Sequence, residues 1–309
     1  MPSALSHLRV LDLSRVLAGP WSSQILADMG AEVIKIERPG SGDDTRDWGP
    51  PFIKDKSGKD TREAAYFLSA NRGKKSLSLD ISKPEGQEII RNLAAISDIL
   101  IENFKVDGLK HYGLDYTSLK KINPKLIYCS ITGFGQTGPY AHQAGYDIMI
   151  QGMGGMMSVT GERDGVPMKV GVAVTDIMTG MYATVAILGA IEHRHQSGEG
   201  QYIDLALLDT QVAMLANVAS NYLVAGKIPQ RMGNAHSTIV PYQSFECADG
   251  HLILAVGNDS QFAKFCHVAQ ATEIKNDVRF ATNSERVKHR DVLVPLLEKI
   301  VQSRKRNDW

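Results

Sequence analysis

The chain is poor in cysteine, and it carries no excess of either charge. Its 309 residues contain only three cysteines, far apart at Cys129, Cys247 and Cys266. The cysteines are not spaced in close pairs as metal ligands would be. They therefore indicate a reducing compartment, where thiols serve as small core residues. The 34 basic residues balance 34 acidic ones. A general nucleic-acid binder would show a basic surplus with clusters, so the balance argues against that class.

Targeting and nucleotide-binding signals are also missing. The N-terminus enters a strand-like run at Leu8 without a secretory signal or a transmembrane span. No Walker-type loop follows any of the expected strands. We therefore expect a cytoplasmic enzyme, and a parallel sheet in it would not by itself indicate a nicotinamide or ATP site.

Short apolar runs alternate with amphipathic segments through the first two thirds of the chain. This alternation predicts an α/β fold with a Rossmann-like parallel sheet that helices cover on both faces. The expected strands are Leu8–Leu13, Glu32–Ile36, Ser76–Leu79, Asp98–Glu102, Leu126–Thr132 and Tyr202–Ala206. The expected helices are Pro20–Met29, Pro84–Ala95, Tyr116–Ile122, Asp176–His195 and Asp209–Ala225.

The composition shifts after residue 225. Gly226–Tyr242 is rich in loop-forming residues, and a new pattern starts with a strand at His251–Val256 and a helix near Ser260. We therefore predict a large domain over residues 1–225, followed by a linker and a smaller α/β domain over residues 226–309.

Asp176 stands between a short apolar run and a long apolar helix that contains Ala and Gly. Thr175 or Asp176 could cap this helix by accepting hydrogen bonds from its first free N–H groups, which alone explains the pair. The alternative is a nucleophilic carboxylate that the positive end of the helix dipole keeps ionised. The two interpretations are compatible, and the pattern alone leaves both open.

Seven blocks share their order and spacing with one enzyme family. They are Val10–Pro20, Gly30–Arg46, Asn71–Ser76, Glu102–Phe104, Gly133–Pro139, Gly145–Asp147 and Val172–Tyr182. From about Leu8 to its last residue the chain resembles the family III coenzyme A transferases, the CaiB/BaiF family. The resemblance implies a large Rossmann-like domain and a small domain from which the chain returns to the large one. No such return is visible, so we expect a chain truncated at the C-terminus.

The resemblance also implies roles for individual residues. Asp176 matches the family nucleophile, which takes the acyl group as a mixed anhydride and then carries CoA as an aspartyl thioester. Asp147 could orient the substrate or the nucleophile, and Tyr146 precedes it in the same block. The positions matching the CoA contacts of the family are Val16, Leu17, Ala18, Arg38, Arg72, Lys75, Asn103 and Phe104. The resemblance further implies that coenzyme A is a substrate and that the enzyme has no tightly bound cofactor and no metal. It also implies that the enzyme is an interlocked homodimer.

Other activities within and outside the family stay open. The α-methylacyl-CoA racemases pair the same Asp with a His thirty residues earlier, where this chain has Tyr146, and a phenol with a pKa near 10 suits proton transfer poorly. Gly40–Phe52, Tyr128–Gly133 and Ser237–Gln243 resemble the branch that uses succinyl-CoA and dicarboxylic acids such as hydroxymethylglutarate or glutarate. A second carboxylate needs a cation, and the residues considered are Arg46, Lys169 and His236. A thioesterase and a non-catalytic acyl-CoA binding protein are the remaining alternatives.

Overall fold

The computed structural model describes residues 3–309, which divide into two compact units. Unit 1 comprises the chain up to Met156 together with Lys169–Ala216, and unit 2 comprises Met157–Met168 and Asn217–Trp309. The sequence predicted this division after residue 225, at the end of one expected helix over Asp209–Ala225. The structure instead has two helices there, α8 (Leu207–Met214) and α9 (Ala216–Ala225). The backbone turns at Ala216, where φ is +42°, and the rest of α9 belongs to unit 2.

Unit 1 is built on a six-stranded sheet in which all neighbouring strands run parallel, in the order β5-β2-β1-β6-β7-β8. The strands are β1 (Arg9–Asp12), β2 (Glu32–Glu37), β5 (Lys74–Ser78), β6 (Ile99–Glu102), β7 (Ile127–Thr132) and β8 (Tyr202–Ala206). The chain moves outward from β1 on one side and from β6 on the other. In such sheets ligands bind outside the carboxyl ends of the strands at this reversal.

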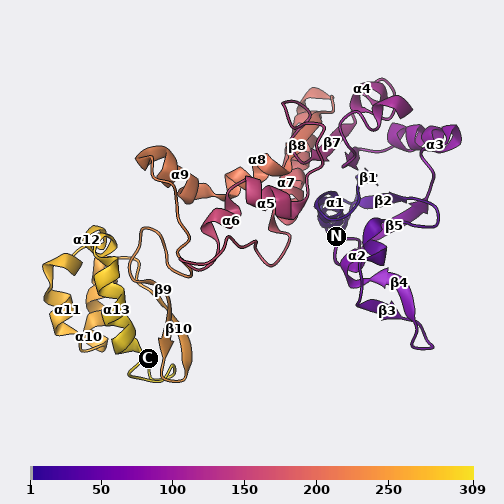
Figure 1. The fold of residues 1–309 in the computed structure, drawn as a ribbon. Coiled ribbons are helices and arrows are strands. Elements are labelled where there is room, and N and C mark those ends of the chain that lie inside the picture. The colour runs from indigo at the N-terminus through magenta and orange to yellow at the C-terminus, as the bar shows by residue number, and fades with distance from the viewer. Residues whose placement is uncertain (1–2) are drawn as a thin grey trace. The chain divides into compact units, whose positions relative to one another are not determined.

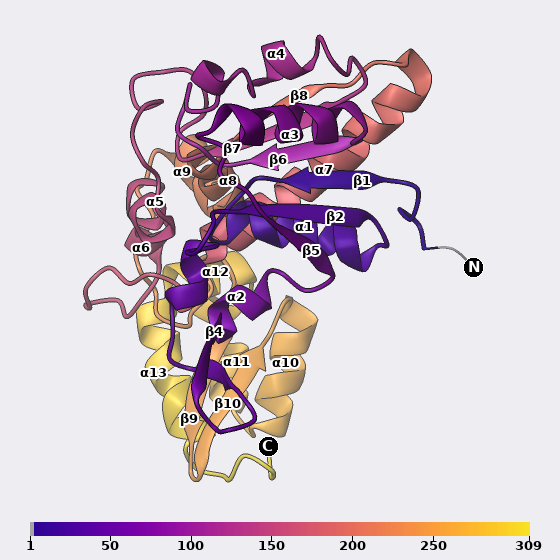
Figure 2. The ribbon, with the colours of Figure 1, turned by 90° about the vertical axis from the view of Figure 1, so that its right-hand side faces the viewer.

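Helices cover both faces of the sheet, as the sequence predicted (Figures 1 and 2). Val10 and Ile101 point to the face that α1 (Ala18–Asp28) and α7 (Val174–Ser197) cover. Leu11 and Leu100, one residue along each strand, point to the face covered by α3 (Pro84–Ala95) and α4 (Tyr116–Leu119). The α/β fold with a parallel sheet is therefore confirmed.

Helix α7 is long and apolar enough by composition to cross a membrane. Its residues Ala183, Ile187 and Ile191 are buried and pack in the core beneath the sheet. The core helix of a globular domain shows the same composition, because it is apolar over much of its circumference.

Several smaller elements of unit 1 have no clear pattern in the sequence. The strands β3 (Phe52–Lys54) and β4 (Asp60–Ala64) form an antiparallel hairpin, which leads into α2 (Ala65–Ser69). The hairpin is mostly exposed and has no apolar alternation, so the periodicity of the sequence did not predict its strands. Unit 1 also contains helix α5 (Asp147–Met153) and 3₁₀ turns at Asp44–Asp47 and Lys110–Tyr112. The short helix α6 (Met156–Val159) begins in unit 1 and continues into unit 2.

Unit 2 packs helices against a two-stranded antiparallel hairpin, β9 (Tyr242–Cys247) and β10 (Gly250–Ala255). The helices are α10 (Asp259–Val268), α11 (Thr272–Asn276), α12 (Asn283–Lys288) and α13 (Arg290–Val301), with a 3₁₀ turn at Val278–Phe280. Phe245, Phe262 and Leu297 are among the buried residues of its core. The fully buried Arg286 donates hydrogen bonds to the carbonyls of Val240 and Phe280, so its guanidinium links three segments of this unit.

Candidate active site

A cavity of about 530 Å³ opens at the carboxyl ends of β6 and β7 in unit 1. Its walls come from the loop after β1, the segments after β6 and β7, and the first turn of α7. The lining residues are Arg15, Val16, Leu17, Ala18, Asp44, Trp48, Asn103, Phe104, Lys105, Val106, Ile131, Thr132, Gly133, Ala141, Gln143, Ala144, Gly145, Tyr146, Asp147, Asp176 and Leu207. The fold thus brings together eight of the residues that the sequence selected, from four separate blocks.

Asp147, in the first turn of α5, caps helix α7. Its Oδ1 accepts hydrogen bonds from the backbone N–H groups of Thr175 at 2.9 Å and Asp176 at 3.3 Å, and its Oδ2 accepts one from the Gln151 amide at 2.6 Å. The expectation that Thr175 or Asp176 caps the helix is therefore wrong. The helix begins at Val174, so Asp176 already lies inside its first turn, and the cap comes from 28 residues earlier in the chain.

The Asp176 carboxylate is half-buried on the cavity wall. Burial and the nearby charge of Asp147 raise the pKa of Asp176 to about 7. The sequence predicted the opposite direction, because it counted only the helix dipole. Desolvation outweighs the dipole here, and Asp147 places a negative charge at the same helix end. The carboxyl group is therefore poised to change its charge near neutral pH.

An aromatic pair that the sequence did not select lies near this carboxylate. Trp48 lines the cavity, and its ring meets the Tyr66 ring edge-on at 5.1 Å between centroids. Burial, with the charges of Asp176 and Asp147, raises the pKa of Tyr66 to about 12. Tyr66 therefore keeps its phenolic proton throughout the neutral range.

The loop after β1 forms the wall on which Val16, Leu17 and Ala18 lie. Asn103 holds it by a reciprocal pair of hydrogen bonds: its Oδ1 accepts from the Arg15 N–H at 2.9 Å, and its Nδ2 donates to the Arg15 carbonyl at 2.7 Å. The Arg15 guanidinium lies 5.8 Å from the centre of the Phe104 ring and pairs with Asp44 at 2.9 Å.

A second cavity of about 210 Å³ shares Arg15 and Phe104 with the first. Arg38 lies here, directly after the carboxyl end of β2. The other lining residues are Leu13, Ile36, Glu37, Gly42, Asp43, Leu79, Asp80, Ile81, Ser82 and Tyr112. The sequence analysis missed Leu79–Ser82. Their position just after β5, at the same sheet edge as Arg38, is the signal that could have found them.

Arg72 and Lys75 line neither cavity. Arg72 forms an exposed ion pair with Asp28, and the exposed Lys75 ammonium lies 2.6 Å from Glu32. Glu32 opens β2 and Arg38 follows its carboxyl end, about 20 Å from Glu32 at the usual rise per residue. The Lys75 ammonium therefore lies near the start of this strand, and Arg38 lies beyond its other end. The structure does not bring these three cations to one site.

The residues that line the larger cavity do not include the three that the sequence considered for a second carboxylate. Arg46 donates two hydrogen bonds to Glu37, at 2.7 and 2.8 Å, and its guanidinium stacks 3.7 Å from the centre of the Phe67 ring. The Lys169 ammonium donates to backbone carbonyls at 3.2 Å, and His236 belongs to unit 2. Among the residues that line the larger cavity, the cations are Arg15 and Lys105.

Two further features bear on what the site can hold. Gly133–Gly138 has the letters G-x-G-x-x-G directly after β7, but the next helix starts only at Asp147. It therefore lacks the helix N-terminus that binds a pyrophosphate in dinucleotide folds. Among residues 3–309, no group of three or more His, Cys, Asp or Glu side chains could hold a metal ion.

Comparison with known proteins identifies the family to which this site belongs. The model of CoA-transferase family III matches residues 5–309. The chain belongs to this family. It is 58% identical over 286 residues to succinate–glutarate CoA-transferase of Agrobacterium fabrum, an alignment that covers 93% of this chain and 71% of the relative. It is 48% identical to succinyl-CoA:glutarate CoA-transferase of Mus musculus, covering 95% of this chain and 66% of the relative.

A solved structure shows the same fold. The crystal structure of a CaiB/BaiF family protein from Brucella suis is 55% identical, with a TM-score of 0.85 over all of this chain and 80% of the other. The family predicted from the sequence blocks is thus confirmed, and the protein is a family III CoA-transferase that acts on CoA thioesters. The transferase prediction is confirmed over the racemase alternative.

Proposed function

We propose that this family III CoA-transferase moves CoA from succinyl-CoA to a second dicarboxylic acid, with Asp176 as the nucleophile. The observation that carries the proposal is the Asp176 carboxylate, which faces the larger cavity while Asp147 satisfies the N–H groups of its helix. The donor and the acceptor class come from the relatives, which are named as succinate–glutarate and succinyl-CoA:glutarate enzymes.

The chemistry proceeds through two covalent intermediates. An Asp176 oxygen attacks the thioester carbonyl, and the C–S bond breaks to leave a mixed anhydride and the CoA thiolate. The thiolate attacks the Asp176 carbonyl carbon, which releases the donor acid and leaves an aspartyl-CoA thioester. The acceptor carboxylate attacks that thioester to form a new anhydride, and the thiolate then attacks the acceptor's acyl carbon. Acyl-CoA leaves, and the Asp176 carboxylate is regenerated without any net proton change.

The side chains around Asp176 support these steps by position and charge. Asp147 and the N–H groups it binds hold the first turn of α7, which sets the direction of the Asp176 carboxylate. Arg15 and Lys105 supply positive charge on the wall of the cavity, where the donor and acceptor acids both need a partner for their distal carboxylates.

A panel of acids tests this proposal. Purified protein with succinyl-CoA should transfer CoA to glutarate and related dicarboxylic acids at least about tenfold faster than to butyrate, since only the former present a second carboxylate to a cation. Free thiol should be followed in parallel. Thiol release without transfer would make the protein a thioesterase, and CoA binding without turnover would make it a binding protein.

The smaller cavity is proposed to hold the nucleotide end of CoA, with Arg38 on its phosphates. Arg38→Ala should raise the Michaelis constant for acyl-CoA about tenfold and change turnover little, because a uniform binding contact is lost. Lys75→Ala is the matched control, since this lysine pairs with Glu32 at the other end of β2. An equal rise in both variants would place the nucleotide nearer to Lys75.

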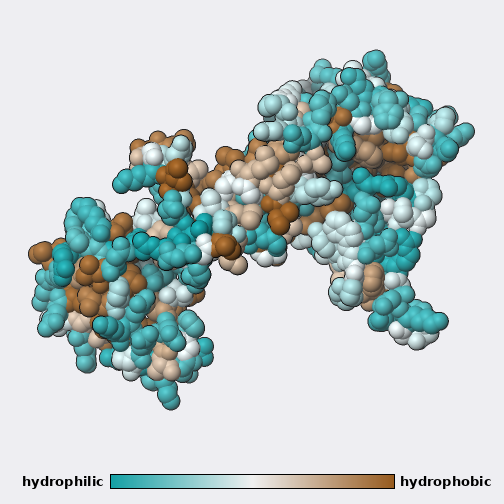
Figure 3. Space-filling view, viewed as in Figure 1, coloured by the Kyte–Doolittle hydropathy of each residue, from teal (hydrophilic) through white to brown (hydrophobic). Residues whose placement is uncertain are grey.

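The assembly is proposed to be a homodimer, interlocked as the family resemblance implies. Helix α7 supports this with exposed apolar side chains on unit 1: Met181, Tyr182 and Val185, the last 64% exposed. Figure 3 shows brown, apolar residues at the surface of unit 1 in the region where Figure 1 labels α5, α7 and α8. Light scattering should give twice the chain mass, and interlocking should keep the dimer intact on dilution. A mass of one chain at every protein concentration would contradict the dimer and the interlocking. A cytoplasmic location and the absence of a tightly bound cofactor are further parts of this proposal.

A further inference from the structure

One residue of the cavity wall has a backbone conformation that its own side chain disfavours. Val16 has φ of +70°, in the left-handed region, which is unusual for a β-branched residue. Val16 lines the larger cavity together with Asp176. Such a conformation persists only where the surroundings determine it, so the contacts around this loop indicate what holds it.

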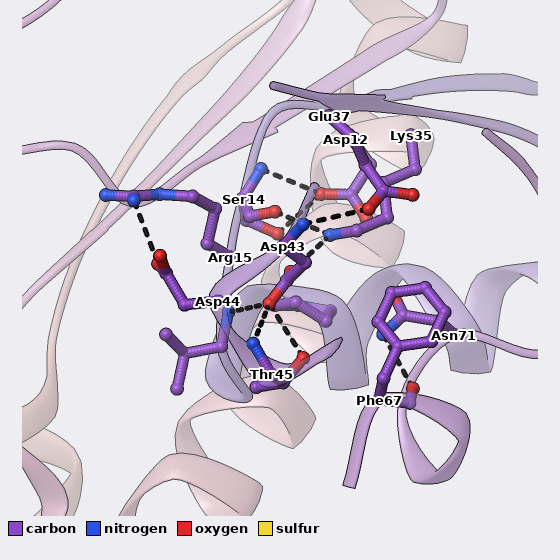
Figure 4. A network of polar contacts seen from close by, with 12 residues as sticks. Asp12, Ser14, Arg15, Lys35, Glu37, Asp43, Asp44, Thr45, Phe67 and Asn71 are labelled. Atoms are coloured by element: carbon purple, nitrogen blue, oxygen red, sulfur yellow. Dashed lines mark hydrogen bonds and ion pairs between the residues drawn. The ribbon is translucent and has the colours of Figure 1, made fainter. Parts of the chain in front are cut away.

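Two further side chains hold the loop: Lys35 on β2, and Asp43, which follows that strand (Figure 4). The Lys35 ammonium donates to the Ser14 carbonyl at 2.8 Å and pairs with the Asp43 carboxylate at 2.9 Å. Asp43 Oδ1 in turn accepts the Val16 N–H at 3.4 Å. The backbone N–H of Asp43 donates to Glu37 at 2.9 Å, so the carboxylate is itself fixed to the end of β2.

This ion pair lies in the interior of unit 1. The side chains of Lys35 and Asp43 are 1% and 0% exposed. The free energy lost when two charges leave water is about as large as the free energy gained from their attraction. Proteins in which such a pair is replaced by apolar residues are therefore often no less stable. Stability alone therefore does not explain the pair. Lys35 lines neither cavity, and its ammonium is linked to the site through the Ser14 carbonyl and the Asp43 carboxylate.

We propose that Lys35 and Asp43 are positioning residues for CoA transfer, which hold Val16 in the left-handed conformation so that the loop forms the cavity wall opposite Asp176. The role in transfer rests on the proposed function. The loop runs directly into α1, so its conformation also decides where the free N–H groups of that helix's first turn lie.

Lys35→Met in the whole chain tests the proposal, with Lys74→Met as the matched control. The Lys74 side chain is 2% exposed and pairs with Asp12 at 3.1 Å, and its ammonium otherwise contacts the Pro20 carbonyl and Asn71. Asp12 accepts the N–H of Ser14 at 2.9 Å, so this control also reaches the start of the loop, but it leaves the contact of Asp43 with Val16 in place. Hydrogen exchange of the amides of residues 15–17 should speed up at least about tenfold in Lys35→Met and stay within about threefold of wild type in Lys74→Met.

A second readout separates positioning from a loss of folded protein. The dissociation constant for CoA should rise at least about tenfold in Lys35→Met, whereas a protein that is still half folded would show only about a twofold rise from the unfolded fraction. The turnover number of the folded variant at saturating succinyl-CoA should fall about 100-fold. If Lys35→Met does not fold, the double variant Lys35→Met with Asp43→Asn replaces it. This double variant leaves no unpaired buried charge, and its amide side chain at position 43 keeps an oxygen that can accept the Val16 N–H. It should show the same faster exchange and weaker CoA binding. Unchanged exchange and CoA affinity would overturn the proposal. A wild-type chain without transfer would reject the proposed function instead, while exchange would still decide the claim about the loop.

Discussion

Asp176→Asn should lower the turnover number for CoA transfer by about 10⁴-fold or more, because an amide cannot form the acyl anhydride. CoA affinity should stay within about threefold of wild type, since the change is nearly isosteric and the capping contacts of Asp147 go to backbone N–H groups. The measurement is steady-state transfer from succinyl-CoA, with CoA binding by calorimetry. Peptide mapping after incubation with acyl-CoA and hydroxylamine should label Asp176 in the wild type alone. Turnover within tenfold of wild type would end this assignment.

The same variant should unfold less readily than wild type at pH 8. The pKa of Asp176 is about 7 in the folded chain, against an ordinary value of 3.8, so ionisation favours the unfolded chain. This loss of stability begins as the pH rises above about 4 and is complete above about 7. Asn carries no charge, so Asp176→Asn should gain about 2 kcal/mol at pH 8, a figure reduced for partial solvent screening, and nothing at pH 3.5. Urea unfolding at the two pH values checks the difference.

The pH dependence of the wild-type enzyme should show an acid limb with an apparent pKa near 7 in kcat/KM for acyl-CoA, since only the ionised Asp176 attacks. The rate should fall tenfold per pH unit below this value, which amounts to about 100-fold at pH 5. Burial is the larger cause of the raised pKa of Asp176 and the charge of Asp147 the smaller, so Asp147→Asn should move the limb to lower pH without abolishing it.

Asp147→Asn keeps an oxygen that can accept the N–H groups of Thr175 and Asp176, and so it isolates the charge of Asp147 from its capping role. Asp147→Ala removes both the charge and the capping oxygens and is the comparison. Asp147→Ala should shift the acid limb and also lower the turnover number on the pH plateau, because the first turn of α7 loses its cap. A rate that is flat between pH 5.5 and 8 would show that Asp176 is ionised throughout this range.

The elements that could be predicted from the sequence are those whose boundaries depend on neighbouring residues. Helix α3 spans Pro84–Ala95, as predicted, because proline at its first turn sets φ and needs no N–H partner. Strand β8 likewise matches its prediction at Tyr202–Ala206. The apolar runs of β1, β6 and β7 indicated a sheet buried on both faces, since such strands need no polar alternation. The joint order and spacing of the seven blocks between Val10 and Tyr182 were enough to predict the family, which is confirmed.

Tertiary structure alone decided the electrostatics and the grouping of the site. The cap of α7 comes from Asp147, far away in the chain, and that contact together with burial reversed the expected direction of the Asp176 pKa shift. Arg38 and Lys75 looked equivalent as cations near strands, but the Lys75 ammonium pairs with Glu32 at the start of β2, whereas Arg38 follows the carboxyl end of that strand. A residue's type and spacing specify local conformation. Its solvent exposure and charged neighbours depend on which distant segments pack beside it, and the pattern of one segment does not contain them.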